Sequence, residues 1–414
     1  MCRITRALIK FELKKIAQRR IFLILLLVFA AFAAYNFAGV ASRYTYDSSL
    51  NRLTGIAAIR YDRDTQNQYA GRYGNAEAAE MRERINAAAE RARSESSEDM
   101  LIYEGRWKYF LQYETVSDGL SRQNAIEDFI IPEIKSNGLI NIYAISGARF
   151  FQFADNWKPI LAAGSPYSEK LLAMYENLEL PLAIEYNLGF ENLVKSLESA
   201  LLFPAAAILA IALAPVFSDE YGAGMAPILL ATKHGKRRLI KCKIIAAYLF
   251  AIGLFLLTAL LYAGFYLLAW GASGAGASIQ TIETFRFSPY GIAAWQALLS
   301  ILGMGFLGFM SIASVALLVS AKTKNSYNAL IPLAAIVFLP LIDISRVSVA
   351  IEKILLLFPI NAVAAADMLR FPIFYNIGGM SLDRIVLSAV VSAVAAAALC
   401  AMAYRAFRAY QARN

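Results

Sequence analysis

The stretch FSDEYGAGMAPILLATKHGKRRLIKCK, residues 217–243, lies between two long apolar segments, 201–217 and 244–270. It begins with the acidic pair Asp219 and Glu220 and ends in a basic run formed by Lys233, Lys236, Arg237, Arg238, Lys241 and Lys243. Short loops rich in Lys and Arg remain on the cytoplasmic side of a membrane. The stretch therefore predicts a multi-pass membrane protein in which residues 218–243 form a cytoplasmic loop.

The whole chain has the composition of a membrane protein, because 58% of its 414 residues are hydrophobic, against about 45–50% in soluble domains. A helix needs about 20 mostly apolar residues to cross the hydrocarbon core. Six segments fit such crossings, namely 21–41, 197–217, 244–270, 292–319, 327–343 and 385–404. We therefore predict an all-α membrane protein with six transmembrane helices.

Three segments outside the crossings complete the predicted topology. Residues 42–196 have a soluble composition and predict a mainly helical extracytoplasmic domain between the first and second crossings. Residues 347–383 are interrupted by Pro359, so they predict broken helices in the outer leaflet. Residues 405–414 form a basic cytoplasmic tail.

Residues 1–20 predict an amphipathic interfacial helix on the cytoplasmic membrane surface. Four apolar side chains share one of its faces, namely Ile4, Ala7, Leu8 and Phe11. The net charge of +9 arises largely from cations in this helix, in the 218–243 loop and in the tail. The charge therefore indicates topology, with both termini in the cytoplasm, and does not predict nucleic-acid binding.

Two helices are predicted in the first half of the extracytoplasmic domain. The first runs from Asn75, a possible N-cap, to Arg93, and has a favourable Glu80–Arg84 pair. Its apolar stripe consists of Met81, Ile85, Ala88 and Ala92. The second, 100–116, aligns Tyr103, Trp107 and Phe110. Core packing is the favoured interpretation of that aromatic stripe, and a ligand-stacking surface is the alternative.

The sequence predicts no catalytic residue and no metal site. It has no GxSxG or HExxH motif, and its three cysteines (Cys2, Cys242 and Cys400) and single His234 lack metal-ligand spacing. The centres of the six predicted crossings lack ionisable side chains, which argues against ion-driven transport. A GxxxxGK[ST] phosphate loop is also missing. Energy for transport would therefore come from another protein.

The middle of the 218–243 loop carries an apolar patch formed by Met225, Ile228, Leu229 and Leu230. An exposed apolar patch on a cytoplasmic helix favours docking to another protein. The alternative is an ordinary basic loop held against anionic lipid headgroups.

The membrane part resembles the permease subunit of ABC-2-type exporters over residues 1–41 and about 197–414. The resemblance rests on the order of an interfacial helix, six crossings, the SAKTKN turn at 320–325 and the Phe358, Pro359 break. It also rests on the loop pattern Glu220, Gly224, Leu229, Leu230, Arg237, Arg238 and Lys243. Two departures concern the docking helix: Met225 stands where the family often has Thr, and Pro227 interrupts the predicted helix.

The resemblance implies a bacterial plasma-membrane exporter of two permease subunits, as a homodimer or heterodimer, with two copies of a separate ABC ATPase. ATP and magnesium would bind the ATPase, and this chain would hold no cofactor. The implied ATPase-coupling residues are Glu220, Tyr221, Gly224, Met225, Ile228, Leu229, Leu230, Arg237 and Arg238. The two arginines would hold the loop against headgroups or acidic ATPase residues.

The fourth crossing contains three glycines, Gly303, Gly305 and Gly308, which predict close packing in the bundle interior or at a subunit interface. Lipid, peptide, ion and polysaccharide all remain open as substrates. Three roles remain open for the large extracytoplasmic domain: gating or capture of substrate, docking of an external partner, and capping of the dimer. A different class of function is a non-transporting membrane scaffold or sensor with an extracytoplasmic ligand-binding domain.

Overall fold

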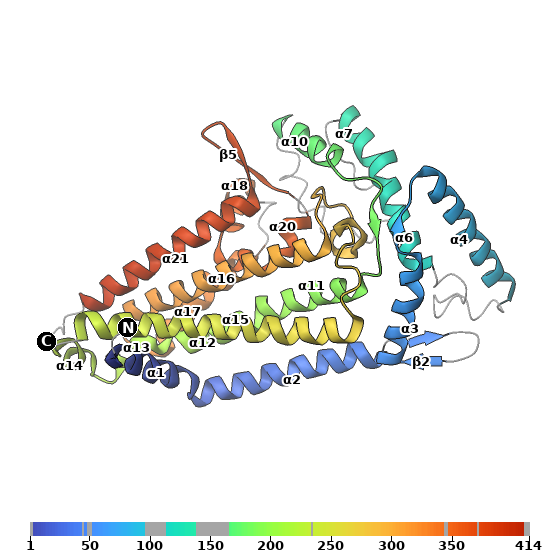
Figure 1. Cartoon of the computed structure of the whole chain (residues 1–414). Coiled ribbons are helices and arrows are strands. Elements are labelled where there is room, and N and C mark those ends of the chain that lie inside the picture. The colour runs from blue at the N-terminus through green and yellow to red at the C-terminus, as the bar shows by residue number, and fades with distance from the viewer. Residues whose placement is uncertain are drawn as a thin grey trace.

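The computed structural model describes residues 3–43, 45–47, 52–95, 113–137, 165–232, 235–342, 347–370 and 372–409. Within them, four helices are long and apolar enough to cross a membrane. These are α2 (Arg20–Arg43), α15 (Ile240–Trp270), α16 (Ala294–Lys322) and α21 (Arg384–Arg408). They run side by side as an elongated bundle (Figure 1). The first, third, fourth and sixth predicted crossings therefore correspond to single helices.

The second predicted crossing is an interrupted helical path that begins nine residues early. It consists of α11 (Leu188–Ala200), the π turn η4 (Leu201–Ala205), α12 (Ala206–Leu213) and α13 (Pro215–Gly222). Pro204 lies inside the π turn, where its missing N–H removes a regular helical hydrogen bond. The fifth predicted crossing is the shorter α17 (Ser326–Phe338), followed by the 3-10 turn η8 (Leu339–Leu341).

The termini lie at one end of the bundle, together with α1 (Arg3–Ala17) and α14 (Ala226–Ala231). The described residues between α2 and α11 lie at the opposite end and are mainly helical. Their helices are α3 (Ile56–Gln66), η1 (Asn67–Tyr69), α4 (Asn75–Glu95), α6 (Glu114–Asn124), η3 (Ala125–Ile130), α7 (Ile131–Asn137) and α10 (Ser165–Glu176). Two short antiparallel pairs join them, β1 (Thr45–Asp47) with β2 (Arg52–Thr54), and β3 (Gly71–Arg72) with β4 (Ala183–Ile184).

Helix α4 confirms three members of the predicted apolar stripe, because Met81, Ile85 and Ala88 are buried; the side chain of Ala92 lies outside the described ones. The predicted Glu80–Arg84 ion pair is also present, at 2.7 Å. The predicted aromatic stripe of Tyr103, Trp107 and Phe110 lies outside the described residues.

The segment 347–383 is only partly helical, so the prediction of broken helices throughout it was wrong in its last third. Its helices are α18 (Val349–Leu355), α19 (Pro359–Val363) and α20 (Ala366–Arg370). A hairpin of β5 (Phe374–Ile377) and β6 (Met380–Asp383) follows. Gly378 and Gly379 both have positive φ, as a two-residue hairpin turn with two left-handed residues requires. The Gly-Gly pair was the turn signal that the helical interpretation missed.

Helix α16 packs along α21 and α19 in the middle of the bundle. Gly308 makes this approach possible, because a Cβ there would lie 2.7 Å from Val363 Cγ2 and 2.8 Å from the Pro359 carbonyl oxygen. Gly305 faces Phe255, whose Cε2 would lie 3.3 Å from a Cβ added at that glycine. Gly303 does not pack in the bundle interior, because a Cβ there would meet nothing within 4 Å among the residues that the structure describes. A subunit interface at Gly303 therefore stays a prediction.

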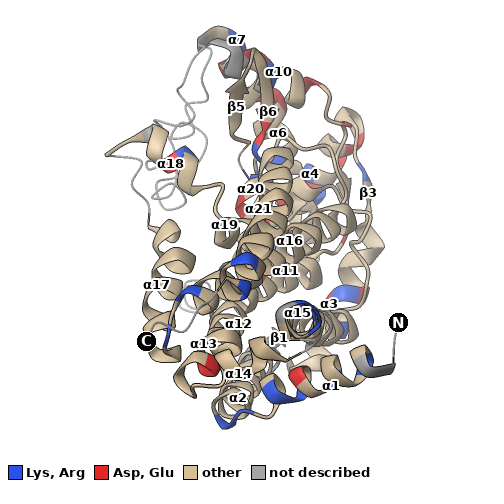
Figure 2. Ribbon diagram, turned by 90° about the vertical axis from the view of Figure 1, so that its left-hand side faces the viewer, with Lys and Arg blue, Asp and Glu red and all other residues tan. Residues whose placement is uncertain are grey.

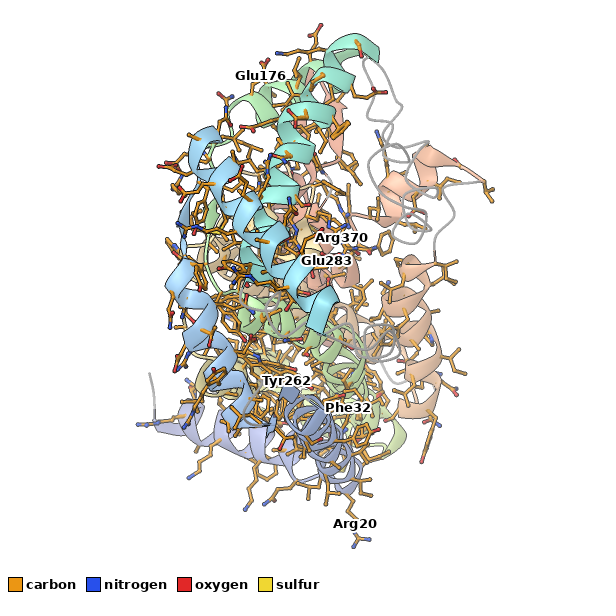
Figure 3. All side chains as sticks on the ribbon, turned by 90° about the vertical axis from the view of Figure 1, so that its right-hand side faces the viewer. Arg20, Phe32, Glu176, Tyr262, Glu283 and Arg370 are labelled. Carbon is orange, nitrogen blue, oxygen red and sulfur yellow. The ribbon has the colours of Figure 1, made fainter. Side chains whose placement is uncertain are left out.

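The connection from α15 to α16 contains two 3-10 turns, η6 (Ile279–Thr281) and η7 (Glu283–Phe285). Buried Arg122 of α6 holds it by donating to the carbonyl oxygens of Gln280 and Thr281. Its guanidinium also lies 2.8 Å from the Glu283 carboxylate. Burial lowers the pKa of Arg122, and Asp118 and Glu283 oppose that shift. Figure 3 shows this end, with Glu283 close to Arg370, whose Nε donates to the Thr284 carbonyl oxygen.

Candidate functional site

The apolar part of the 218–243 loop forms a short helical hairpin made of α13 and α14. Gly224 has a φ of 67° in the turn between them, a left-handed conformation that favours glycine. The turn is closed by the Met225 amide, which donates to the Glu220 carbonyl oxygen at 2.9 Å. Pro227 lies in the first turn of α14, where a helix does not need its N–H. Pro227 therefore starts the helix, and the prediction that it interrupts the helix was wrong.

The two faces of α14 differ in exposure. Ala226 and Leu230 are buried against the bundle, whereas Ile228 is 60% exposed and Met225 is 43% exposed. Leu229 is partly exposed between them. The outward apolar surface therefore consists of Met225, Ile228 and Leu229, which we call the α14 patch.

Tyr221 and Leu230 face the protein, although the sequence assigned both to the docking contact. The Tyr221 hydroxyl donates to the Ala321 carbonyl oxygen at 2.9 Å. Its ring centroid lies 5.4 Å from that of Phe407 in α21. Leu230 is only 5% exposed. These two side chains attach the hairpin to the bundle.

Beyond α14, the π turn η5 (Gly235–Leu239) leads into α15. Arg237 is exposed there and Arg238 is half-buried. Seen along the bundle from this end, basic segments gather on α1, the start of α15 and the end of α21 (Figure 2). The α14 patch therefore lies on a positively charged end of the molecule.

Lys243 joins three elements beneath the hairpin. Its side chain is 1% exposed, and its Nζ lies 2.9 Å from Glu12 Oε2 of α1 and 2.8 Å from Glu220 Oε1 of α13. Lys15 of α1 approaches the same Glu220 oxygen at 2.7 Å. We call these four residues the buried charge cluster. The sequence treated Lys243 as a loop cation and Glu220 as a coupling residue, and the structure places both inside the protein.

The electrostatics of Glu220 follow from this cluster. Burial alone raises the pKa of its carboxyl group, but the positive charges of Lys243 and Lys15 outweigh burial. The net result is a pKa below the ordinary value of a glutamate. Glu220 is therefore held as a carboxylate between two ammonium groups.

A second set of contacts ties α13 to α1 and to the start of α17. Arg19, which follows α1, lies 2.8 Å from Asp219 Oδ2. The Ser326 hydroxyl donates to the other carboxylate oxygen of Asp219. Asp219 and Glu220 therefore both pair with the N-terminal segment, although no pattern in the sequence indicated that pairing.

The SAKTKN turn lies directly against α13. The buried Ser320 hydroxyl accepts from the amides of Phe217 at 2.9 Å and Ser218 at 3.1 Å. Asn325 caps α17 by accepting from the Tyr327 amide at 3.0 Å. The SAKTKN turn and the 218–243 loop, which the sequence singled out separately, are thus brought together at one end of the bundle.

The hairpin connects an exposed apolar surface to several long helices. A small apolar surface projects outward, and the helix that carries it is attached through α13 to α1, α15, α16 and α21. Within the described residues, no cluster of His, Cys, Asp and Glu side chains has the geometry to hold a metal ion. A force applied to the α14 patch would reach several long helices at once.

Four helices long and apolar enough to cross a membrane define the chain as a membrane protein. The family model described as ABC-2 family transporter protein matches residues 6–407. The chain therefore belongs to the ABC-2 transporter family and is the membrane component of an ABC transporter. No curated protein and no solved structure matches the chain significantly.

Proposed function

We propose that this chain is the permease subunit of an exporter, which moves its substrate out of the cell using ATP hydrolysed by a separate ATPase. The observation that carries this proposal is the exposed α14 patch on a hairpin attached to the long helices. An apolar surface of this kind fits a groove on a partner protein. Family membership supports an ABC ATPase as that partner.

The proposed topology places six crossings in a bacterial plasma membrane. The interrupted path from α11 through α12 and the shorter α17 supply the two crossings beyond the four long helices. The basic end, with both termini and the α14 patch, faces the cytoplasm, because Lys and Arg in short loops favour that side. The mainly helical residues between α2 and α11 then form an extracytoplasmic domain.

In the proposed mechanism, the ATPase binds ATP and magnesium and moves the α14 patch as its two copies close. Helix α13 passes this motion to α1 and α15 through the buried charge cluster. It passes the motion to α16 through the Ser320 hydroxyl. Two permease chains, identical or different, would enclose the substrate path in contact with membrane lipid.

The test is affinity purification of the full chain from its native membranes, followed by an ATPase assay of the eluate. We expect a stoichiometric partner that carries a phosphate-loop motif and shows vanadate-sensitive activity. Transport in vesicles containing both chains should consume ATP and move substrate away from the ATPase side. A chain that purifies alone and without activity from several detergents would overturn the proposal and favour a scaffold or sensor.

A further inference from the structure

A cavity of about 280 Å³ lies at the end of the bundle opposite the termini. Three stretches that are distant in sequence line it: β3, the chain between α10 and β4, and the connection from α15 to α16 together with the first turn of α16. The residues that matter below are Arg72, Glu179, Ser278, Gln280, Gly291 and Gln296. The cavity thus joins the mainly helical domain to the membrane bundle.

One wall of the cavity is a set of extended segments held by backbone hydrogen bonds. Arg72 pairs with Ala183 between β3 and β4. The Ser278 amide donates to the Ala183 carbonyl oxygen, and the Ser278 hydroxyl accepts from the Ala183 amide, both at 2.9 Å. Ser278 also forms an antiparallel bridge with Ala293. The wall is therefore formed before any ligand arrives, which lowers the entropic cost of binding.

Two oppositely charged side chains in the lining form an ion pair, so their charges cancel. Arg72 Nη2 lies 3.0 Å from Glu179 Oε2, and Arg72 Nη1 donates to the Pro181 carbonyl oxygen at 3.0 Å. A ligand with a net charge would lose hydration without meeting a net opposing charge. The lining therefore favours a neutral ligand.

Two amide side chains in the lining supply complementary hydrogen-bonding groups. The Gln280 amide nitrogen donates to the carbonyl oxygens of Ser288 and Tyr290, so these bonds leave its oxygen as an acceptor. The Gln296 oxygen accepts from the Ala293 amide at 2.9 Å, so this bond leaves its NH₂ group as a donor. A hydroxyl group both donates and accepts, and it matches such a pair.

We propose that this cavity is a binding site for a small neutral polyol of about monosaccharide size. Its volume lies just below the roughly 300–1,000 Å³ of pockets for larger ligands. The bound molecule would bridge β3 to the α15–α16 connection and stabilise that contact. This site is separate from the α14 patch and does not depend on ATPase docking.

The test uses the full chain in lipid nanodiscs, so that sugar-headed detergents do not compete. The probes are D-glucose and myo-inositol, with glucose 6-phosphate as the charged comparison. Saturation-transfer NMR measures binding, and the unfolding midpoint measures ligand stabilisation. We expect saturable millimolar binding of a neutral probe, a midpoint higher by a few degrees, and at least tenfold weaker binding of the phosphate. Failure of both neutral probes, or equal binding of the phosphate, would overturn the proposal.

Two variants with a matched control localise the signal. Gly291→Leu adds a side chain to the lining and should abolish binding. Glu179→Ala removes the carboxylate that balances the charge of Arg72, so it should leave the lining positive and reduce the preference for the neutral probes over glucose 6-phosphate several-fold. Because the Glu179 side chain is 81% exposed, the midpoint of the free protein should not change. Glu176→Gln, which lies outside the lining and pairs with Lys135, should bind like the parent. Unchanged binding in Gly291→Leu together with an unchanged preference in Glu179→Ala would overturn the assignment to this cavity.

Discussion

Lys243 lies 2.8 Å from Glu220, and its other carboxylate partner, Glu12, is 231 residues away in sequence. One ammonium group thus joins the N-terminal helix, the α13–α14 hairpin and the start of α15. Glu12 and Glu220 both depend on this cation, which Lys15 supplements at Glu220, because neither buried carboxylate has bulk water as a full substitute.

Removal of that cation should destabilise the protein. Lys243→Met leaves Glu12 and Glu220 buried near each other, and we expect a loss of about 3–5 kcal/mol in the free energy of unfolding. Thermal unfolding of the purified chain measures this loss. Lys241→Met, at an exposed position two residues away, is the matched control and should have little effect.

The combined variant Glu12→Gln, Lys243→Met, Glu220→Gln removes the charges of Lys243 and of both its carboxylate partners. It should regain part of the stability lost in Lys243→Met. If Lys243→Met unfolded at the same temperature as the parent, the buried charge cluster would have no structural importance.

The lowered pKa of Glu220 predicts acid sensitivity. In the unfolded chain this carboxyl group titrates near its ordinary pKa of about 4.3, and in the folded chain it titrates lower. Its stabilising contribution is therefore present above about pH 4.3 and is lost as the pH falls through the folded pKa. As the pH is lowered from about 6 to about 3, the midpoint of thermal unfolding should fall less steeply for Glu220→Gln than for the parent. Glu179→Gln, at a highly exposed position, should keep the parental slope, and a parental slope for Glu220→Gln would contradict the prediction.

The glycines of α16 should differ in their response to alanine. Gly308→Ala places a Cβ within 2.8 Å of both Val363 Cγ2 and the Pro359 carbonyl oxygen, so we expect a loss of about 1–3 kcal/mol from overpacking. Gly303→Ala meets open space, and it should be neutral or stabilising by up to about 1 kcal/mol through helix propensity. Chemical unfolding of the two variants side by side tests the contrast. Equal stability of the two would mean that α16 and α19 do not approach this closely.

Charges on the α14 patch should uncouple the proposed exporter. Met225→Asp with Ile228→Asp changes two exposed side chains, so the protein should fold and insert while ATPase association or ATP-driven transport falls at least tenfold. Met380→Asp alters another exposed apolar residue, on the β5–β6 hairpin, and should leave coupling intact. Normal association and transport by the double variant would place docking elsewhere. Leu230 is unsuitable for this test, because an aspartate at a buried position would also unfold the hairpin.

The long apolar runs predicted α2, α15, α16 and α21 correctly, because the length of a hydrophobic segment is a local property of the chain. The stripe of Met81 and Ile85 in α4 was predictable for the same reason. The orientation of α1 about its own axis was not predictable in this way. Its predicted apolar face includes Phe11, which is 64% exposed, whereas Ile9, Glu12 and Ile16 are buried. Periodicity finds a helix, but it does not say which face meets the protein when lipid is an alternative.

The candidate site shows the same division between local and distant information. The pattern at 217–243 located the loop and its apolar residues, and Met225 and Ile228 are exposed as docking would require. Lys243 was misinterpreted because its partners lie 23 and 231 residues away, and no periodicity relates them. Ser320 belongs to the SAKTKN motif, but the sequence indicated no role for its side chain. Its hydrogen bonds to Phe217 and Ser218 arise only in the folded bundle.

Helix α16 has 29 residues without an internal proline, which corresponds to a rod of about 43 Å. Near one end the Ser320 hydroxyl holds α13, and just before the other end Ala293 bridges to Ser278. The connection beyond that end is held by Arg122 of the distant domain. In the proposed exporter, a tilt imposed at the basic end would therefore reach the opposite end of the bundle, because α16 is one continuous helix without a proline kink.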